Sequence, residues 1–135
     1  MKKSGFCAVL FVLAILIGCA CGKRSSDTEL SYGTYVGVLP CADCSGILTH
    51  VSINRDSTAV ISRLYYGSDS IPETKHGTWT YAEGIITVKI PWEELYYKVE
   101  EDTAIVMVDR RGDVPSVMRD KYRLCKTFYD AGCSD

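Results

Sequence analysis

Two cysteines, Cys41 and Cys44, stand in the stretch LPCADCSGI between a proline and a glycine. Such a C-x-x-C pair can hold a metal, act as a redox couple or form a disulfide. When reduced, two thiolates are soft ligands that suit Cu(I), whereas a structural zinc site requires four protein ligands. The residues of a suitable type for a third ligand are His50, His76, Met107, Met118 and Cys125. Nothing in their spacing selects one, so the third ligand stays unknown.

The cysteine pair has three interpretations besides a metal site. A redox catalyst lowers the pKa of a C-x-x-C thiol most effectively at a helix N-terminus. Pro40 and the strand-like segments on both sides predict no helix there, and Asp43 opposes thiolate formation, so we expect no thioredoxin-like catalysis. A structural disulfide across so short a loop gains little loop-closure entropy. The remaining interpretation is a resting disulfide that reports on oxidants, or that binds metal only when reduced.

A second pair of cysteines, Cys125 and Cys133, flanks the segment KTFYDAG near the end of the chain. A disulfide between them would fix the last predicted strand to a tail that would otherwise fray. We predict a structural disulfide here, with a share in the metal site as the alternative. Cys21 is the expected spare thiol.

The elements that must position these cysteines are predicted to be strands almost throughout. Runs rich in Val, Ile, Thr, Tyr and Trp lie at 32–39, 47–54, 57–66, 76–81, 85–92, 95–101, 103–109 and 120–128. Residues 47–54 alternate between apolar and polar side chains, as expected for a sheet with one wet face. Short turns between short strands predict an all-β fold, namely a small antiparallel up-and-down β-barrel of about eight strands. A β-sandwich is the competing architecture.

The amino-terminal residues have the pattern of a bacterial lipoprotein signal. A basic MKK precedes an uncharged apolar run, Phe6 to Gly18, which is too short to span a bilayer comfortably. The run ends in LIGC, which resembles a lipobox with Cys19 as the lipidated residue; an ordinary signal peptide is the alternative. We therefore predict a signal peptide at 1–18, a lipidated cysteine and flexible tether at 19–31, and one folded domain at 32–135. The lipid on Cys19 would attach the protein to a membrane.

Charge and motifs exclude several functions. Acidic side chains outnumber basic ones, 17 to 15, and loss of Lys2 and Lys3 with the signal peptide widens the difference, so no nucleic-acid partner is expected. No serine–histidine–carboxylate order and no glycine-rich phosphate loop can be argued, so we expect no enzyme. Ala20 after the lipidated cysteine favours the outer membrane.

The block from Gly37 to Ile47 reads GVLPCADCSGI, and GTW at 77–79 and DRRG from Asp109 follow it. These motifs, in this order, resemble the N-terminal domain of the NlpE family of copper-resistance and envelope-stress lipoproteins. The resemblance covers 32–123. It implies an eight-stranded, lipocalin-like barrel in the bacterial envelope with the C-x-x-C in the loop after the first strand. It also implies links to copper tolerance, surface adhesion and signalling to a sensor kinase.

The sequence departs from the family pattern in two places. Asp56-Ser57-Thr58 stands where the family has Asp-Gly-Thr. Longer members carry a second barrel of OB type, which we do not expect in this chain, and direct stress signalling is therefore not a firm expectation.

These observations predict a non-enzymatic envelope lipoprotein of NlpE type that senses or buffers copper or redox stress through Cys41 and Cys44. The expected cofactor, if any, is Cu(I), and the expected partners are the membrane and an envelope stress sensor kinase or another periplasmic protein. One alternative is a lipocalin-like carrier of a small apolar ligand, and another is a structural lipoprotein of surface adhesion. The aromatic residues that would line a carrier's cavity, or simply fill the barrel, are Tyr65, Tyr66, Trp79, Trp92, Tyr96 and Tyr97.

Overall fold

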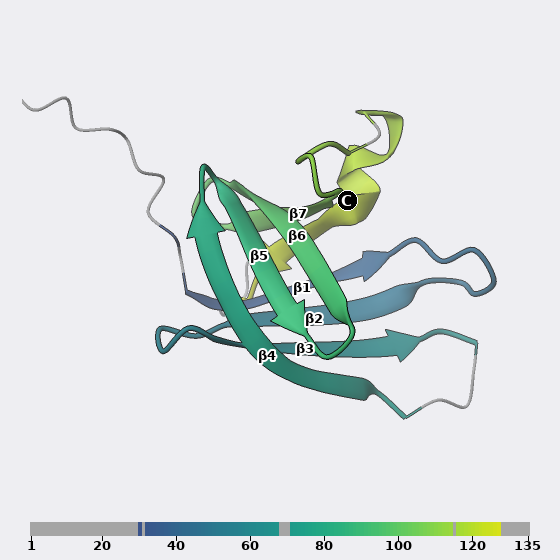
Figure 1. Cartoon of the computed structure of the whole chain (residues 1–135). Helices are drawn as coiled ribbons and strands as arrows, with labels where there is room; N and C mark the ends of the chain where they lie inside the picture. Colours follow the sequence, from purple (N-terminus) through teal and green to yellow (C-terminus); the bar gives the residue numbers. More distant parts are fainter. Residues whose placement is uncertain (1–29, 31, 68–70, 115, 128–135) are drawn as a thin grey trace, which may run out of the picture.

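The described part of the chain forms one closed antiparallel β-barrel (Figure 1). The computed structural model describes residues 30, 32–67, 71–114 and 116–127. Its elements are β1 (Gly33–Leu39), β2 (Ile47–Ile53), β3 (Thr58–Tyr65), β4 (Glu73–Ala82), β5 (Ile85–Ile90), β6 (Glu93–Glu100), β7 (Ala104–Val108), the 3-10 helix η1 (Ser116–Tyr122) and β8 (Arg123–Lys126). The prediction of an all-β, up-and-down, lipocalin-like barrel of about eight strands is confirmed.

Each strand pairs with its neighbours in sequence, and β8 closes the barrel against β1. The β1–β2 ladder is complete, from Gly33 opposite Ile53 to Leu39 opposite Ile47. The β1–β8 ladder that closes the barrel is shorter, because it consists of two residue pairs, Tyr35 opposite Lys126 and Val36 opposite Cys125. Short turns between adjacent antiparallel strands make this meander order possible.

The core follows the period-two pattern of the strands. In β2 the inward residues Thr49, Val51 and Ile53 are fully buried, as the alternation in the sequence predicts. In β5 the buried positions are Ile86, Val88 and Ile90. Inward side chains from every strand except β4 meet in one buried cluster, with Tyr97 of β6 and Leu124 of β8 among its completely buried members. From β4, the partly buried Trp79 and Tyr81 pack against this cluster.

Three predicted strands have boundaries that differ clearly from the structure. The strand predicted at 76–81 begins three residues earlier, at Glu73. The strand predicted at 85–92 ends at Ile90, because Pro91 and Trp92 form the two-residue turn that leads into β6. Trp92 is therefore fully exposed and has a φ of 68°, although the alternation places it with the inward residues. The strand predicted at 120–128 begins only at Arg123, since the preceding residues belong to η1.

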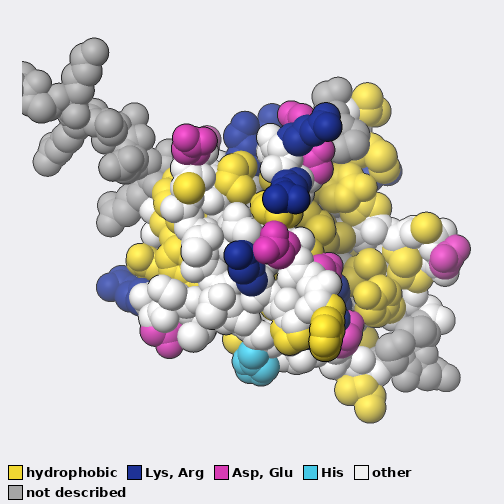
Figure 2. Space-filling view, in the orientation of Figure 1, with side chains coloured by type: hydrophobic (Ala, Val, Ile, Leu, Met, Phe, Trp, Pro, Cys, Tyr) yellow, Lys and Arg dark blue, Asp and Glu magenta, His cyan; other side chains and the backbone are white. Residues whose placement is uncertain are grey.

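The two ends of the barrel differ in character. We call one end the disulfide rim; it carries loop 40–46, the β3–β4 connection, the Pro91–Trp92 turn and the segment between β7 and β8. The opposite rim carries Tyr32 and the tight turns after β2, β4 and β6. Figure 2 shows hydrophobic side chains gathered toward the disulfide rim, on the right of the view. Strongly exposed examples there are Val38, Ile71, Trp92 and Val117.

Within the described ranges, no helix is both long enough and apolar enough to span a membrane.

Candidate functional site

Cys41 and Cys44 are joined by a disulfide in the loop between β1 and β2, with their Cα atoms 5.3 Å apart. The chain leaves β1 at Leu39, turns through Pro40 and the cysteine pair, and enters β2 after Gly46. Glycine is required at position 46, since its φ is 153° and a Cβ there would lie 2.6 Å from Val38 Cγ1. The predicted position of the C-x-x-C, in the loop after the first strand, is confirmed.

The disulfide borders a cleft at the disulfide rim. This cleft has a volume of about 530 Å³, and its lining is Ala42, Asp43, Cys44, Ser45, Tyr66 and Gly67. The backbone N–H of Tyr66 donates to the Gly46 carbonyl oxygen at 2.9 Å, which ties the β1–β2 loop to the end of β3. The Cys44 sulfur lies 3.4 Å from the same carbonyl oxygen. Both cysteines are half-buried, so reagents in solution can reach the bond.

None of the candidate third ligands is among the residues that line the cleft beside Cys44. Among the described residues, no three His, Cys, Asp or Glu side chains form a group that could hold a metal ion. His50 and His76 lie in the middle of β2 and β4, and Met107 lines a different pocket. Met118 belongs to η1. Within loop 40–46, Cys41 and Cys44 supply two sulfur atoms and Asp43 supplies one carboxylate.

The remaining predicted cysteines are only partly described. Cys125 lies in β8 opposite Ala104, and it is disulfide-bonded. Cys133 lies outside the described residues, so the Cys125–Cys133 pairing stays a prediction. Cys19 and the proposed signal peptide at 1–18 also lie outside the described residues.

An ion pair that the sequence analysis missed crosses the barrel mouth beneath the disulfide rim. Arg63 of β3 donates two hydrogen bonds to the Glu93 carboxylate of β6, at 3.0 and 2.9 Å. The hydrogen bonds from Arg63 lower the pKa of Glu93. Tyr97 lies completely buried next to this pair, and burial raises the pKa of its hydroxyl. The one available signal was that Arg63 continues the inward series of Ala59 and Ile61 in β3.

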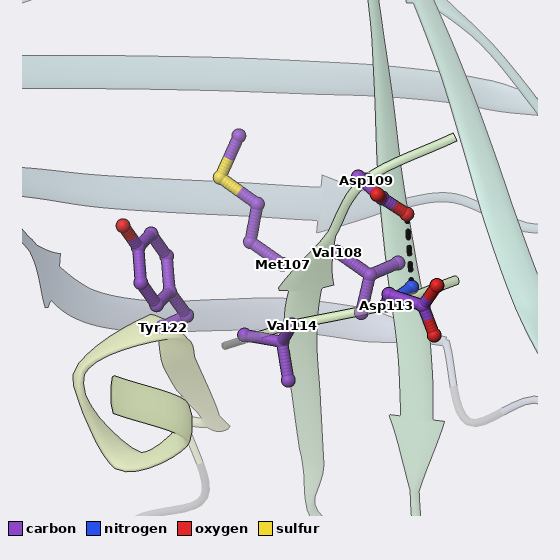
Figure 3. A pocket seen from close by; sticks show the side chains of 6 residues that line it. All are labelled: Met107, Val108, Asp109, Asp113, Val114 and Tyr122. Carbon is purple, nitrogen blue, oxygen red and sulfur yellow. Dashed lines mark hydrogen bonds between the residues drawn. The ribbon is translucent and has the colours of Figure 1, made fainter. Parts of the chain in front are cut away.

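A second pocket opens beside β7 (Figure 3). Its volume is about 550 Å³, and its lining is Met107, Val108, Asp109, Asp113, Val114 and Tyr122. Figure 3 shows Met107, Val114 and Tyr122 around one end and the two aspartates at the other. The Asp109 carboxylate accepts the backbone N–H groups of Asp113 at 2.9 Å and Arg111 at 2.8 Å, which lowers its pKa and fixes the turn.

The predicted aromatic set does not line a single cavity. Tyr97 is in the core, and Trp79 packs against the core with its indole N–H donating to the Asn54 carbonyl oxygen at 2.8 Å. Tyr96 donates to the Glu94 carboxylate at the surface. Trp92 is fully exposed at its turn, and Tyr66 lines the cleft beside Cys44.

Comparison with known proteins gives consistent matches. The family model described as NlpE N-terminal domain matches residues 35–117. Lipoprotein NlpE of Escherichia coli K12 is 29% identical over an alignment of 126 residues, and the match covers 84% of this chain and 53% of that protein. The 17 kDa lipoprotein of Treponema pallidum is 34% identical over an alignment of 90 residues, and the match covers 58% of this chain and 58% of that protein. This chain thus spans a little over half the length of these curated relatives.

Solved structures agree with the sequence matches. A lipoprotein of Shewanella oneidensis superposes with a TM-score of 0.65 at 28% identity, covering 76% of this chain and 95% of that one. The Escherichia coli NlpE structure, described as the Cpx pathway activator, superposes with a TM-score of 0.55 at 27% identity. The match covers 76% of this chain and 51% of that one. With the family model matching more than half of the sequence and the barrel matching as well, the chain belongs to the NlpE family of lipoproteins.

Proposed function

We propose that the protein is a non-enzymatic, lipid-anchored envelope protein in which the Cys41–Cys44 pair is a redox-gated copper site. The observation that carries this proposal is the accessible disulfide between two half-buried cysteines in a rim loop, away from the core. In the disulfide neither sulfur is a thiolate, and the pair has no strong affinity for metal. Reduction by a thiol reductant adds two electrons and two protons and yields two thiols, whose thiolates suit Cu(I).

The loop has the properties that such a switch requires. The bond lies outside the hydrophobic cluster, and the β1–β2 ladder is complete up to Leu39, so the sheet does not depend on the loop for its pairing. The adjacent cleft gives a small oxidant or reductant access to Cys44. Among the described residues no three His, Cys, Asp or Glu side chains form a group, and a site built on two sulfurs favours a soft monovalent ion over Zn²⁺.

Anchoring and partners complete the proposal. The lipobox at Cys19 and the lipoprotein names of the relatives support attachment to the bacterial envelope, with the outer membrane favoured by Ala20. A sensor kinase or another periplasmic protein is the proposed recipient of the signal. Support for this part comes from the Escherichia coli relative, which is described as a pathway activator.

Cu(I) titration against a competing chelator tests the proposal. Residues 20–135 would be titrated oxidised and reduced, alongside the Cys41→Ser/Cys44→Ser variant. We expect tight binding of one equivalent only by the reduced wild type. Equal binding by the oxidised protein or by the variant would rule out this loop as the copper site.

A carrier function is the second candidate, and the apolar pocket beside β7 favours it. Its volume of about 550 Å³ lies within the usual range of ligand sites, roughly 300–1,000 Å³. Val114→Glu would place a charge among the apolar lining residues. If the protein is a carrier, this change should abolish the blue shift of an apolar fluorescent probe without changing Cu(I) binding.

A further inference from the structure

The first half of β4 has an edge with no strand partner among the described residues. Residues Glu73–Gly77 pair with β3 alone, and pairing with β5 begins only at Thr78 opposite Lys89. The cause is local to Gly77. A Cβ at this position would lie 1.9 Å from the Lys89 carbonyl oxygen, so the end of β5 passes over Gly77 instead of continuing along β4.

The backbone groups at this edge are directed outward. The Trp79 N–H donates to the Ser57 carbonyl oxygen at 3.0 Å, which fixes the phase of the β3–β4 ladder. Along an antiparallel ladder, residues that hydrogen-bond to the partner strand alternate with residues whose N–H and C=O groups point away from it. Gly77 and Lys75, two and four residues before Trp79, therefore turn their N–H and C=O groups toward β3. Those of Thr74 and His76 therefore point to the free edge. An exposed row of this kind is a template for another strand.

Two strongly exposed apolar side chains flank this edge. Ile71, two residues before β4, is 87% exposed. Trp92 is fully exposed in the turn that follows Ile90, and Ile90 itself lies against Gly77. The φ of 68° at Trp92 is an uncommon conformation for a bulky residue and costs free energy. Figure 2 shows hydrophobic side chains in this part of the molecule, below the centre of the view.

We propose that the free edge of β4 pairs with the same edge of a second copy of this chain. The two strands would run antiparallel about a two-fold axis at Thr74, which makes the interface isologous. Thr74 of each copy then exchanges both backbone hydrogen bonds with Thr74 of the other. His76 comes opposite Pro72, whose carbonyl oxygen can still accept a hydrogen bond.

Complementary charges and apolar side chains favour a second copy of the chain as the partner, in the register with the two-fold axis at Thr74. Within one copy, Lys75 Nζ lies 3.0 Å from Glu73 Oε1. With the axis at Thr74, Glu73 of one copy would also lie opposite Lys75 of the other, and the two ion pairs would join into one group of alternating charge. Ile71 of one copy comes opposite Gly77 of the other, next to the turn that presents Trp92. The two flanking apolar side chains would therefore cover each other. Shifting the axis to Lys75 would instead oppose two lysines, which is unfavourable.

The expected dimer is weak. A strand edge of five residues with two flanking side chains buries much less than the ~800 Å² per partner of a standard interface. The proposed lipid anchor would hold copies on one membrane surface at a raised effective concentration, where a weak contact can be populated. The pairing itself does not depend on the anchor or on the Cys41–Cys44 disulfide.

Site-specific cross-linking in the envelope tests the proposal. The full-length chain carrying Cys21→Ser, which removes the expected spare thiol, and Thr74→Cys would be produced in a bacterial host, oxidised with diamide and run on a non-reducing gel; every variant of this experiment carries Cys21→Ser. Residues in a hydrogen-bonded antiparallel pair have Cα atoms ~5.5 Å apart, within the range of a disulfide. The matched control is Thr80→Cys, an equally exposed position of β4 whose backbone is paired with β5. We expect several-fold more dimer from Thr74→Cys than from Thr80→Cys.

Three further variants in the Thr74→Cys background test the register. Glu73→Lys should reduce the dimer band, and Glu73→Lys combined with Lys75→Glu should restore it. Trp92→Gly should also reduce the band, while circular dichroism shows an intact fold. Equal bands at positions 74 and 80 would indicate random collision and overturn the proposal. No cross-link at position 74 would overturn it too, as would a cross-link to a different protein only.

Discussion

At the scale of single residues, the ion pair between Arg63 and Glu93 explains how two charged side chains are accommodated at the mouth of the barrel. The two side chains come from strands that are not neighbours, and they span the interior. Because each satisfies the other, neither leaves an unpaired charge near the buried Tyr97.

Glu93→Gln should therefore lower the free energy of unfolding at pH 7. Arg63 would lose its charged partner while half-buried, which costs about 1–2 kcal/mol at this partly exposed site. The lowered pKa of Glu93 sets the pH dependence. Its stabilisation is fully present above the ordinary carboxyl pKa of 4.5, and it is lost as the pH falls through the lower pKa of the folded state.

Urea unfolding at pH 7 and at a pH below the lowered pKa of Glu93 in the folded state measures this difference. The gap between wild type and Glu93→Gln should shrink at the lower pH, because Glu93 itself becomes protonated. Glu94→Gln is the matched control, since Glu94 is solvent-exposed and bonded only to surface groups. An equal loss of stability in both variants would contradict a specific role for the Arg63–Glu93 pair.

At the scale of elements, the missing side chain of Gly77 allows the end of β5 to cross close to β4 at the point where their ladder ends. Gly77→Ala should lower the free energy of unfolding by about 1–3 kcal/mol, because the new methyl group would overlap the Lys89 backbone. Thermal unfolding followed by circular dichroism provides the measurement.

Gly84→Ala is the comparison at the β4–β5 turn. Nothing lies within 4 Å of a Cβ at Gly84, so only its φ of 80° opposes alanine. We expect a cost of about 1 kcal/mol there. A larger loss for Gly84→Ala than for Gly77→Ala would contradict the close approach of β5 at Gly77.

The strands with alternating apolar residues were predictable from the sequence, and the irregular ends were not. Ile47 to Ile53 alternate as a half-buried strand should, and β2 has these bounds. Trp92 continues the apolar alternation of β5, so the pattern predicted a strand where the chain turns. Pro91 was the residue that indicated a turn. The first residues of β4 are polar, and no pattern distinguishes such an edge from a loop. Arg63 and Glu93 are 30 residues apart, and only barrel closure brings them together.

At the scale of the whole molecule, the disulfide and the hydrophobic core occupy different places. The Cys41→Ser/Cys44→Ser variant should therefore keep the barrel fold and lose at most about 2 kcal/mol of stability, the entropy expected for so short a loop. Far-UV circular dichroism and thermal unfolding of this variant measure the effect. Unfolding of the variant at 25 °C would show that the disulfide is structural, and a reversible switch would then be untenable.

The course of β1 has a mechanical consequence. This strand runs from Gly33 at the opposite rim to Leu39 at the disulfide rim, and it is paired with β2 along its whole length. A pull applied at Tyr32 would load the β1–β2 hydrogen bonds in shear, all of them together, before any tension reached Cys41. The cysteine loop is thus shielded from drag at the end where the chain enters the barrel, and its chemistry can respond to the surrounding solution alone.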